Sequence, residues 1–140
     1  MSNSKLSIHL SYNGNCAEAF SFYERALGAK IDMMMTYGAS PMAGAVPPEE
    51  AGLVMHATLN IGGDRIVGAD STSSHPYQGS VGFGVSLDYT TLAEAERVFH
   101  ALAEGGTLIM PFGPTFWSKG FGMVTDRFGV AWMIGAEQAG

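Results

Sequence analysis

Hydrophobic residues recur at two different periods along the chain, and each period indicates one kind of secondary structure. In the segments 15–28 (NCAEAFSFYERALG) and 91–105 (TLAEAERVFHALAEG), apolar residues return every three or four positions, as on one face of a helix. A glycine stands at the end of each segment, where helices often close in a left-handed conformation. The pattern therefore predicts two amphipathic helices.

Both predicted helices begin in the same way. Asn15 is followed three residues later by Glu18, and Thr91 is followed three residues later by Glu94. This spacing is the capping-box pattern, in which two side chains bind amide groups of the first turn that would otherwise be unpaired. We expect Asn15 and Thr91 to be the N-caps.

Apolar and polar residues alternate in eight shorter segments, as in half-buried strands. Four surround the first helix and four surround the second. They cover about residues 7–12, 30–37, 54–61 and 65–69, and then 81–89, 107–110, 120–125 and 130–134. The order strand–helix–three strands occurs twice, so the chain is predicted to be an α+β protein built from two βαβββ modules. We expect one domain over residues 1–140, with modules at about 5–70 and 80–135.

Two further features bear on this repeat. An Asp-Arg pair opens the last strand of each module, Asp64-Arg65 in the first and Asp126-Arg127 in the second. The first module is longer because it contains the Pro/Gly-rich segment 38–52. A loop of that length is usually functional or disordered.

Alternation assigns each strand two faces. In the first strand Ile8, Leu10 and Tyr12 form an apolar face that should pack under the helix, with His9 and Ser11 on the other. In the other strands we assign the apolar sets Met55, Ala57, Leu59 and Ile61; Val81, Phe83, Val85 and Leu87; and Val130, Trp132 and Ile134. The opposite sets include His56, Thr58, Gly82, Gly84 and Met133. We expect these mixed faces to line a concave cleft.

The segment 110–134 (MPFGPTFWSKGFGMVTDRFGVAWMI) carries the most detailed pattern. An aromatic loop with Phe112, Phe116 and Trp117 leads into a predicted β-hairpin that turns at Asp126-Arg127. Phe116 and Trp117 could stack on a flat ligand or close the core beneath the loop.

Composition narrows the class of protein. The 140 residues are 46% hydrophobic and only 14% charged, which suggests that part of the surface is covered by another subunit. A net charge of −6 with 7 Lys and Arg argues against nucleic acid or an anionic membrane as a partner. A single cysteine, Cys16, and the lack of a signal-peptide pattern favour a cytoplasmic location.

Three stretches together resemble the PhnB-like branch of the vicinal oxygen chelate superfamily, which includes glyoxalases, bleomycin-resistance proteins and dioxygenases. They are YNGNCAEAFSFYERALGA, MHATLNIGGDRIVGAD and TFWSKGFGMVTDRFGVAWMI. The resemblance implies a half-barrel of strands per module, a homodimer, and a ligand site in the cleft. Some members of this branch carry a ubiquinone methyltransferase label, but the sequence contains no strand–glycine-loop–helix unit for S-adenosylmethionine.

The resemblance also implies where a divalent metal would bind. Metal-dependent members use four residues on four cleft strands, and the matching positions are Ser7 (or His9), His56, Gly82 and Met133. Glycine offers no ligand and a thioether suits Mg, Mn or Zn poorly. We therefore expect no metal and no other cofactor.

Several candidate residues admit alternatives. His9 and His56 could be metal ligands, a general base or polar lining, and lining is the commonest role for isolated strand histidines. His75 and His100 are expected at the surface. Cys16 follows a helix cap, but no partner base is evident and an inert thiol is favoured.

Asp70 could accept hydrogen bonds at the rim of the cleft or cap a turn, and we favour the turn. Nine methionines, including Met33 to Met35 in a row, could form an adaptable binding surface or simply core.

The favoured hypothesis is a metal-free PhnB-like protein that binds a small organic molecule, with no assignable reaction. The expected ligand-binding residues are His9, Ser11, His56, Thr58, Phe116, Trp117 and Met133. One alternative is a lyase, isomerase or dioxygenase that holds a divalent ion with His9 and His56. Another is a scaffold protein whose own side chains fill the cleft.

Overall fold

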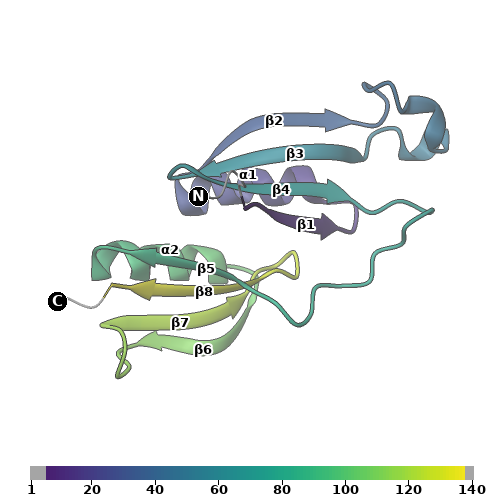
Figure 1. Ribbon diagram of the computed structural model, residues 1–140. Helices are drawn as coiled ribbons and strands as arrows, with labels where there is room; N and C mark the ends of the chain where they lie inside the picture. The colour runs from purple at the N-terminus through teal and green to yellow at the C-terminus, as the bar shows by residue number, and fades with distance from the viewer. Residues whose placement is uncertain (1–5, 138–140) are drawn as a thin grey trace. The chain divides into compact units, whose positions relative to one another are not determined.

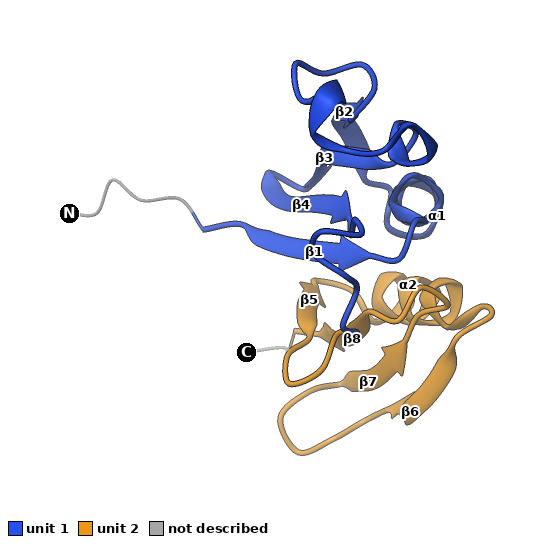
Figure 2. Ribbon diagram, turned by 90° about the vertical axis from the view of Figure 1, so that its right-hand side faces the viewer, with its two compact units in different colours: residues 1–79 blue, residues 80–140 orange. Residues whose placement is uncertain are grey.

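The computed structural model describes residues 6–137, which divide into two compact units between Gly79 and Ser80. Each unit contains one four-stranded sheet and one long helix that covers one face of that sheet (Figures 1 and 2). The predicted α+β class with two βαβββ modules is confirmed. None of the helices in the described part of the chain is long and apolar enough to span a membrane.

Unit 1 follows the predicted order of elements. They are β1 (Ile8–Tyr12), α1 (Cys16–Leu27), β2 (Lys30–Thr36), β3 (Val54–Ile61) and β4 (Asp64–Asp70). The sheet order is β1-β4-β3-β2, with β1 parallel to β4 and the other pairs antiparallel. The long segment between β2 and β3 folds into two short 3₁₀ helices, η1 (Ala43–Ala45) and η2 (Pro48–Glu50).

Unit 2 repeats this arrangement. Its elements are β5 (Val85–Tyr89), α2 (Leu92–Ala103), β6 (Thr107–Gly113), β7 (Gly120–Thr125) and β8 (Ala131–Ala136). The sheet order is β5-β8-β7-β6, again with only the first pair parallel.

Backbone pairing defines which positions of the two modules correspond. The amide of Ser71 donates to the carbonyl oxygen of Tyr12 at 2.7 Å. In the same way, the amide of Glu137 donates to the carbonyl oxygen of Tyr89 at 2.8 Å. Tyr12 therefore corresponds to Tyr89, and the last residues of β4 correspond to the last residues of β8.

This correspondence corrects one detail of the predicted repeat. Arg65 lies within β4, where it pairs with Asn60, whereas Asp126 and Arg127 lie in the turn before β8. The two Asp-Arg pairs are not equivalent, because the β7–β8 turn is longer than the β3–β4 turn.

The core of each unit lies between the helix and one sheet face, as the alternation predicts. In unit 1 Leu10, Tyr12 and Leu59 are fully buried, and in unit 2 Trp132 and Ile134 are. Each such side chain stabilises the folded state by about 1.5–3 kcal/mol through apolar burial.

Both predicted residues occupy the N-cap positions, but only Thr91 makes the expected side-chain capping bond. The Thr91 hydroxyl accepts a hydrogen bond from the Glu94 amide at 3.2 Å. Asn15 makes no side-chain cap bond; instead the Asp70 carboxylate accepts from the Cys16 amide at 2.9 Å. A carboxylate from β4 thus takes over the role that the sequence assigned to Asn15.

The predicted strand 81–89 begins four residues late. Val81 is 86% exposed and Phe83 is 47% exposed, so neither packs under α2 as expected. Gly82 has a φ of 84°, which is incompatible with an extended strand. β5 therefore begins only at Val85, and Gly82 occupies no strand position.

Candidate functional site

The face of each sheet that is not covered by its helix is called here the helix-free face. In unit 1, residues paired across neighbouring strands point to the same side, so the register places His9, Val67, Thr58 and Met33 in one row. His9 is exposed on the edge strand, whereas Thr58 and Val67 are buried and Met33 is 38% exposed.

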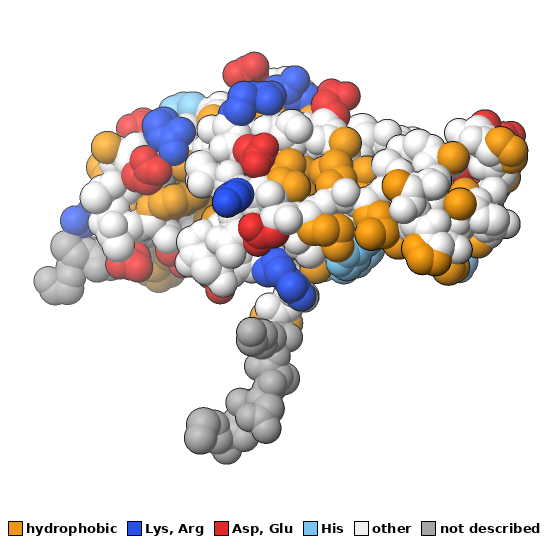
Figure 3. Space-filling view, turned by 90° about the horizontal axis from the view of Figure 1, so that it is seen from above, with side chains coloured by type: hydrophobic (Ala, Val, Ile, Leu, Met, Phe, Trp, Pro, Cys, Tyr) orange, Lys and Arg blue, Asp and Glu red, His pale blue; other side chains and the backbone are white. Residues whose placement is uncertain are grey.

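A second row runs parallel to the first. Ser11 pairs with Ala69, and Met35 pairs with His56. The sequence-predicted residues His9, Ser11, His56 and Thr58 thus share the helix-free face of unit 1. Figure 3 shows the face of the molecule that carries β2 and the 37–53 segment, where hydrophobic side chains gather over one part and charged side chains over another.

The two strand histidines are well separated on this face. β4 lies between their strands, and the row that contains His56 is two residues along the strands from the row that contains His9. Strand spacing and rise place their Cα atoms about 12 Å apart. His9 and His56 are therefore suited to contacting different parts of a ligand.

A cavity of about 370 Å³ opens at the end of β1 and β4 in unit 1. His9 and Ser11 line it together with Tyr37, Thr72 and His75. The prediction that His75 lies at the surface is confirmed, but it missed that this imidazole shares a cavity with His9. The sequence signal for this placement was that His75 follows the end of β4 by only a few residues.

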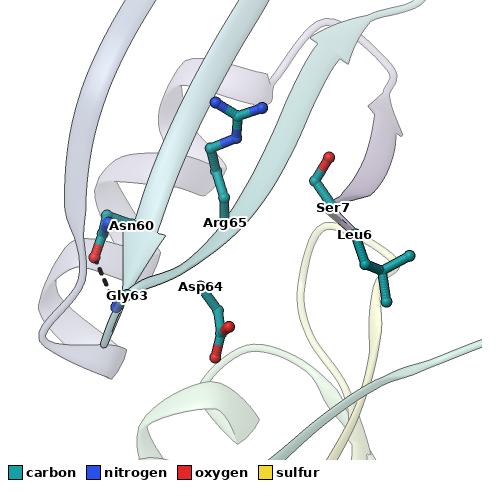
Figure 4. Close-up of a pocket in the computed structure, with 6 residues that line it drawn as sticks. All are labelled: Leu6, Ser7, Asn60, Gly63, Asp64 and Arg65. Atoms are coloured by element: carbon teal, nitrogen blue, oxygen red, sulfur yellow. Dashed lines mark hydrogen bonds between the residues drawn. The ribbon is translucent and has the colours of Figure 1, made fainter. Parts of the chain in front are cut away.

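A second cavity in unit 1, of about 440 Å³, lies beside the β3–β4 turn. Figure 4 shows the Arg65 side chain directed to the same side as Ser7, with Asp64 pointing elsewhere. The Asn60 side-chain oxygen accepts a hydrogen bond from the Gly63 amide at 3.1 Å, which holds the turn. None of the predicted ligand-binding residues lines this cavity.

The helix-free face of unit 2 has a different chemical character. Its first row consists of Ser86, Met133, Met123 and Met110 on four neighbouring strands. All three methionines are half-buried. The sequence singled out Met133 alone, because the pairing that brings Met110 and Met123 beside it cannot be read from periodicity.

The second row of unit 2 contains Asp88, Gly135, Phe121 and Gly113. A Cβ at position 135 would lie 2.7 Å from Oδ1 of Asp88, so glycine leaves room for that carboxylate to lie across the sheet. Asp88 is exposed and Phe121 is half-buried.

Three aromatic rings adjoin this row. The centroids of Phe116 and Trp117 are 4.8 Å apart, and those of Trp117 and Phe121 are 5.3 Å apart, both in edge-to-face geometry. Phe116 is 94% exposed and Trp117 is 48% exposed, so these two rings do not close the core. Trp117 and Phe121 line a cavity of about 350 Å³.

The residues present do not fit the metal centre of the superfamily. Within residues 6–137 no group of three or more His, Cys, Asp or Glu side chains could hold a metal ion. Register makes Val67 the counterpart of Met133 in the first module, and not His56. Neither of these equivalent positions supplies a good ligand for a hard divalent cation.

Cys16 and Asp70 have structural roles. Burial, with a further contribution from the charge of Asp70, raises the pKa of the Cys16 thiol to about 12. The second oxygen of Asp70 accepts a hydrogen bond from the Val54 amide at 2.9 Å. Asp70 thus joins α1, β3 and β4 and caps the helix, where we had favoured a turn; the thiol beside it is inert at neutral pH.

The remaining histidine, His100, is exposed on α2. Its Nε2 atom lies 3.8 Å from a carboxylate oxygen of Glu96, one helical turn away. It lies at the surface, as predicted.

Comparison with known proteins assigns the family. A family model described as 3-demethylubiquinone-9 3-methyltransferase matches residues 4–135. Protein YjdN of Escherichia coli K12 is 37% identical in an alignment of 139 positions that covers 92% of this chain and 92% of that one. The chain belongs to the PhnB-like family of the vicinal oxygen chelate superfamily.

Solved structures agree with this assignment. The PA1353 protein of Pseudomonas aeruginosa is 45% identical with a TM-score of 0.89, covering 98% of this chain and 100% of that one. A PhnB protein of Bacillus cereus, described as a putative 3-demethylubiquinone-9 3-methyltransferase, is 28% identical with a TM-score of 0.78, covering 95% of this chain and 99% of that one. The fosfomycin resistance protein FosX of Listeria monocytogenes, at 12% identity and a TM-score of 0.66 over 99% and 96%, shares the fold.

The residues of this PhnB-like chain do not fit a strand–glycine-loop–helix site for S-adenosylmethionine. Such sites place a glycine-rich loop between a strand and the helix that follows it. The segment 13–15 between β1 and α1 contains one glycine, and residues 90–91 between β5 and α2 contain none. The first turn of each helix is already bound by Asp70 or Thr91.

Proposed function

We propose that this PhnB-like protein binds a small, largely apolar organic molecule on the helix-free faces of its modules, without an assignable reaction. The observation that carries the proposal is the row of half-buried Met110, Met123 and Met133, together with the exposed rings of Phe116 and Trp117, which adjoin Phe121 in the next row of the same face. Exposed apolar groups that gather in this way usually mark a binding surface.

Methionine suits this role because its flexible thioether chain adapts to ligands of different shape. Gly113 carries no side chain and leaves open space above the sheet, whereas the Asp88 carboxylate occupies the space over Gly135. The rings of Phe116 and Trp117 offer large contact areas with only two rotatable bonds each. An apolar ligand would remove this surface from water at about 25 cal/mol per Å².

The helix-free face of unit 1 is a separate candidate binding surface and is more polar. His9 and Ser11 border the cavity at the end of β1, and His56 and Thr58 share the same sheet face. Hydroxyl and imidazole groups can donate or accept hydrogen bonds, so they would orient polar groups of a ligand. The proposed binding residues are therefore His9, Ser11, His56, Thr58, Phe116, Trp117 and Met133.

The proposal is tested by titrating the protein with N-phenyl-1-naphthylamine, a neutral dye whose fluorescence rises in apolar surroundings. We expect saturable binding that weakens about fivefold to tenfold in Met133→Gln, because roughly 1 kcal/mol or more of apolar contact is lost. Met42→Gln is the matched control, because Met42 is 51% exposed in unit 1 and lies in no proposed site. Absence of saturable binding, or equal weakening by both substitutions, would contradict the proposal.

A further inference from the structure

The aromatic cavity of unit 2 carries negative charge. Asp88 and Glu137 line it together with Trp117 and Phe121, and none of its lining residues within 6–137 is basic. Lys119 follows this aromatic segment in the sequence but is not part of the cavity wall. The cavity therefore combines two carboxylates with two aromatic rings.

Neither carboxylate makes an ion pair within residues 6–137. Asp88 lies across Gly135 and Glu137 follows the end of β8, so both belong to the rim of the same sheet face. The hydroxyl of Ser118 is already engaged, since it lies 2.7 Å from the Gly120 carbonyl and 2.6 Å from that of Ala136. The free polar groups at this cavity include two hydrogen-bond acceptors with negative charge.

The charge and the aromatic rings of the cavity lining determine which class of ligand it favours. Aromatic faces attract cations through the ring quadrupole, and this attraction adds to that of nearby carboxylates. An anionic ligand would meet two like charges, and no cation among the described lining residues offsets them. A neutral apolar ligand would gain contact with the rings but nothing from Asp88 or Glu137.

We infer that the ligand of this site carries a protonated or quaternary amine attached to an apolar group. The amine would lie between Asp88 and Glu137 with the rings of Trp117 and Phe121 beside it, and the apolar group would lie over the methionine row. This inference rests on the proposed function and names the class of molecule that the same face would bind.

The test uses three probes of nearly equal size and different charge: 2-phenylethylamine, which is cationic at pH 7, 2-phenylethanol and phenylacetate. The chain has two tryptophans, Trp117 and the fully buried Trp132, so two indole N–H signals are expected in a nitrogen-15 NMR spectrum. Trp117→Phe assigns them. Titration is followed on the Trp117 signal at constant ionic strength.

We expect the amine to bind at least threefold more tightly than the alcohol, and phenylacetate to bind most weakly. Asp88→Asn should weaken amine binding about threefold to fivefold and leave the alcohol unchanged, as for an exposed charge pair. Asp32→Asn is the control, because Asp32 is an exposed carboxylate on β2 of unit 1. Loss of the preference for the amine at high salt is a further expected result.

The outcomes separate this inference from the proposed function. Equal affinities for amine and alcohol would overturn the amine inference and leave a neutral binding face. A Trp117 signal unmoved by any probe, in protein that still binds N-phenyl-1-naphthylamine, would also overturn it. If that dye fails to bind as well, the proposed function fails with it.

Discussion

At the scale of single residues, Asp70 shows how one carboxylate can fix several elements. It is only 6% exposed, and its two oxygens accept the amides of Cys16 and Val54, at the starts of α1 and β3. Periodicity could not predict this role, because Cys16 and Asp70 are 54 positions apart. The same limit applies to His75, whose neighbours come from other elements.

Asp70→Ala is predicted to lower the free energy of unfolding by about 2–4 kcal/mol, because two buried amides lose a charged acceptor. Urea denaturation measures the change. Asp64→Ala provides the control in the same strand; Asp64 is exposed, and its loss should cost no more than about 0.5 kcal/mol. A small effect at Asp70 comparable to that at Asp64 would refute the role given to this carboxylate.

In the first strand, the residues that the alternation placed on each face are where it put them. Leu10 and Tyr12 are buried under α1 while His9 and Ser11 are exposed on the other side, because a strand's side-chain period is two regardless of its partners. The periodicity cannot say which residues of other strands become neighbours. Register decides that, and it assembles the methionine row.

At the scale of elements, both helices were predictable because their apolar spacing and terminal glycines are local properties. β5 was placed too early because Val81 and Phe83 continue the alternation of apolar residues, although the chain there is not extended. The positive φ of Gly82 keeps the strand from extending back to Val81. A glycine in the sequence does not reveal this, because glycine adopts positive and negative φ about equally readily.

The two helix starts make a matched pair for a mutational test. Thr91→Ala should destabilise the protein by about 1 kcal/mol, because the hydroxyl caps the Glu94 amide. Asn15→Ala should change stability by less than about 0.5 kcal/mol, because Asn15 makes no cap bond. Thermal or urea unfolding distinguishes the two. Equal losses at both positions would contradict the assignment of the α1 cap to Asp70.

At the scale of the whole molecule, the repeat could be predicted and the chemistry of its sites only in part. The order of elements in both modules follows from the two periods of the sequence. The gathering of three methionines in one row of unit 2, and of two histidines on the corresponding face of unit 1, emerges only from strand pairing. Spacing alone could not identify which positions match the metal-ligand positions of the superfamily, because Val67 rather than His56 is the counterpart of Met133.

The prediction that residues 1–140 form one domain has a measurable consequence. Units of this size bury too little surface to be very stable alone, so we expect both to unfold in one transition. Both tryptophans lie in unit 2, whereas the single, buried Cys16 lies in unit 1. Tryptophan fluorescence and pulse labelling of Cys16 should give the same urea midpoint. Two separate midpoints would show two independent domains.

The central claim is that the helix-free face of unit 2 binds an apolar ligand through its methionine row. The most direct measurement is NMR of protein labelled with carbon-13 at the methionine methyl groups, titrated with N-phenyl-1-naphthylamine and assigned with single Met→Leu variants. The account predicts shifts of the Met110, Met123 and Met133 signals, while the signal of exposed Met42 stays in place. Saturable binding that leaves those three signals unmoved would contradict it.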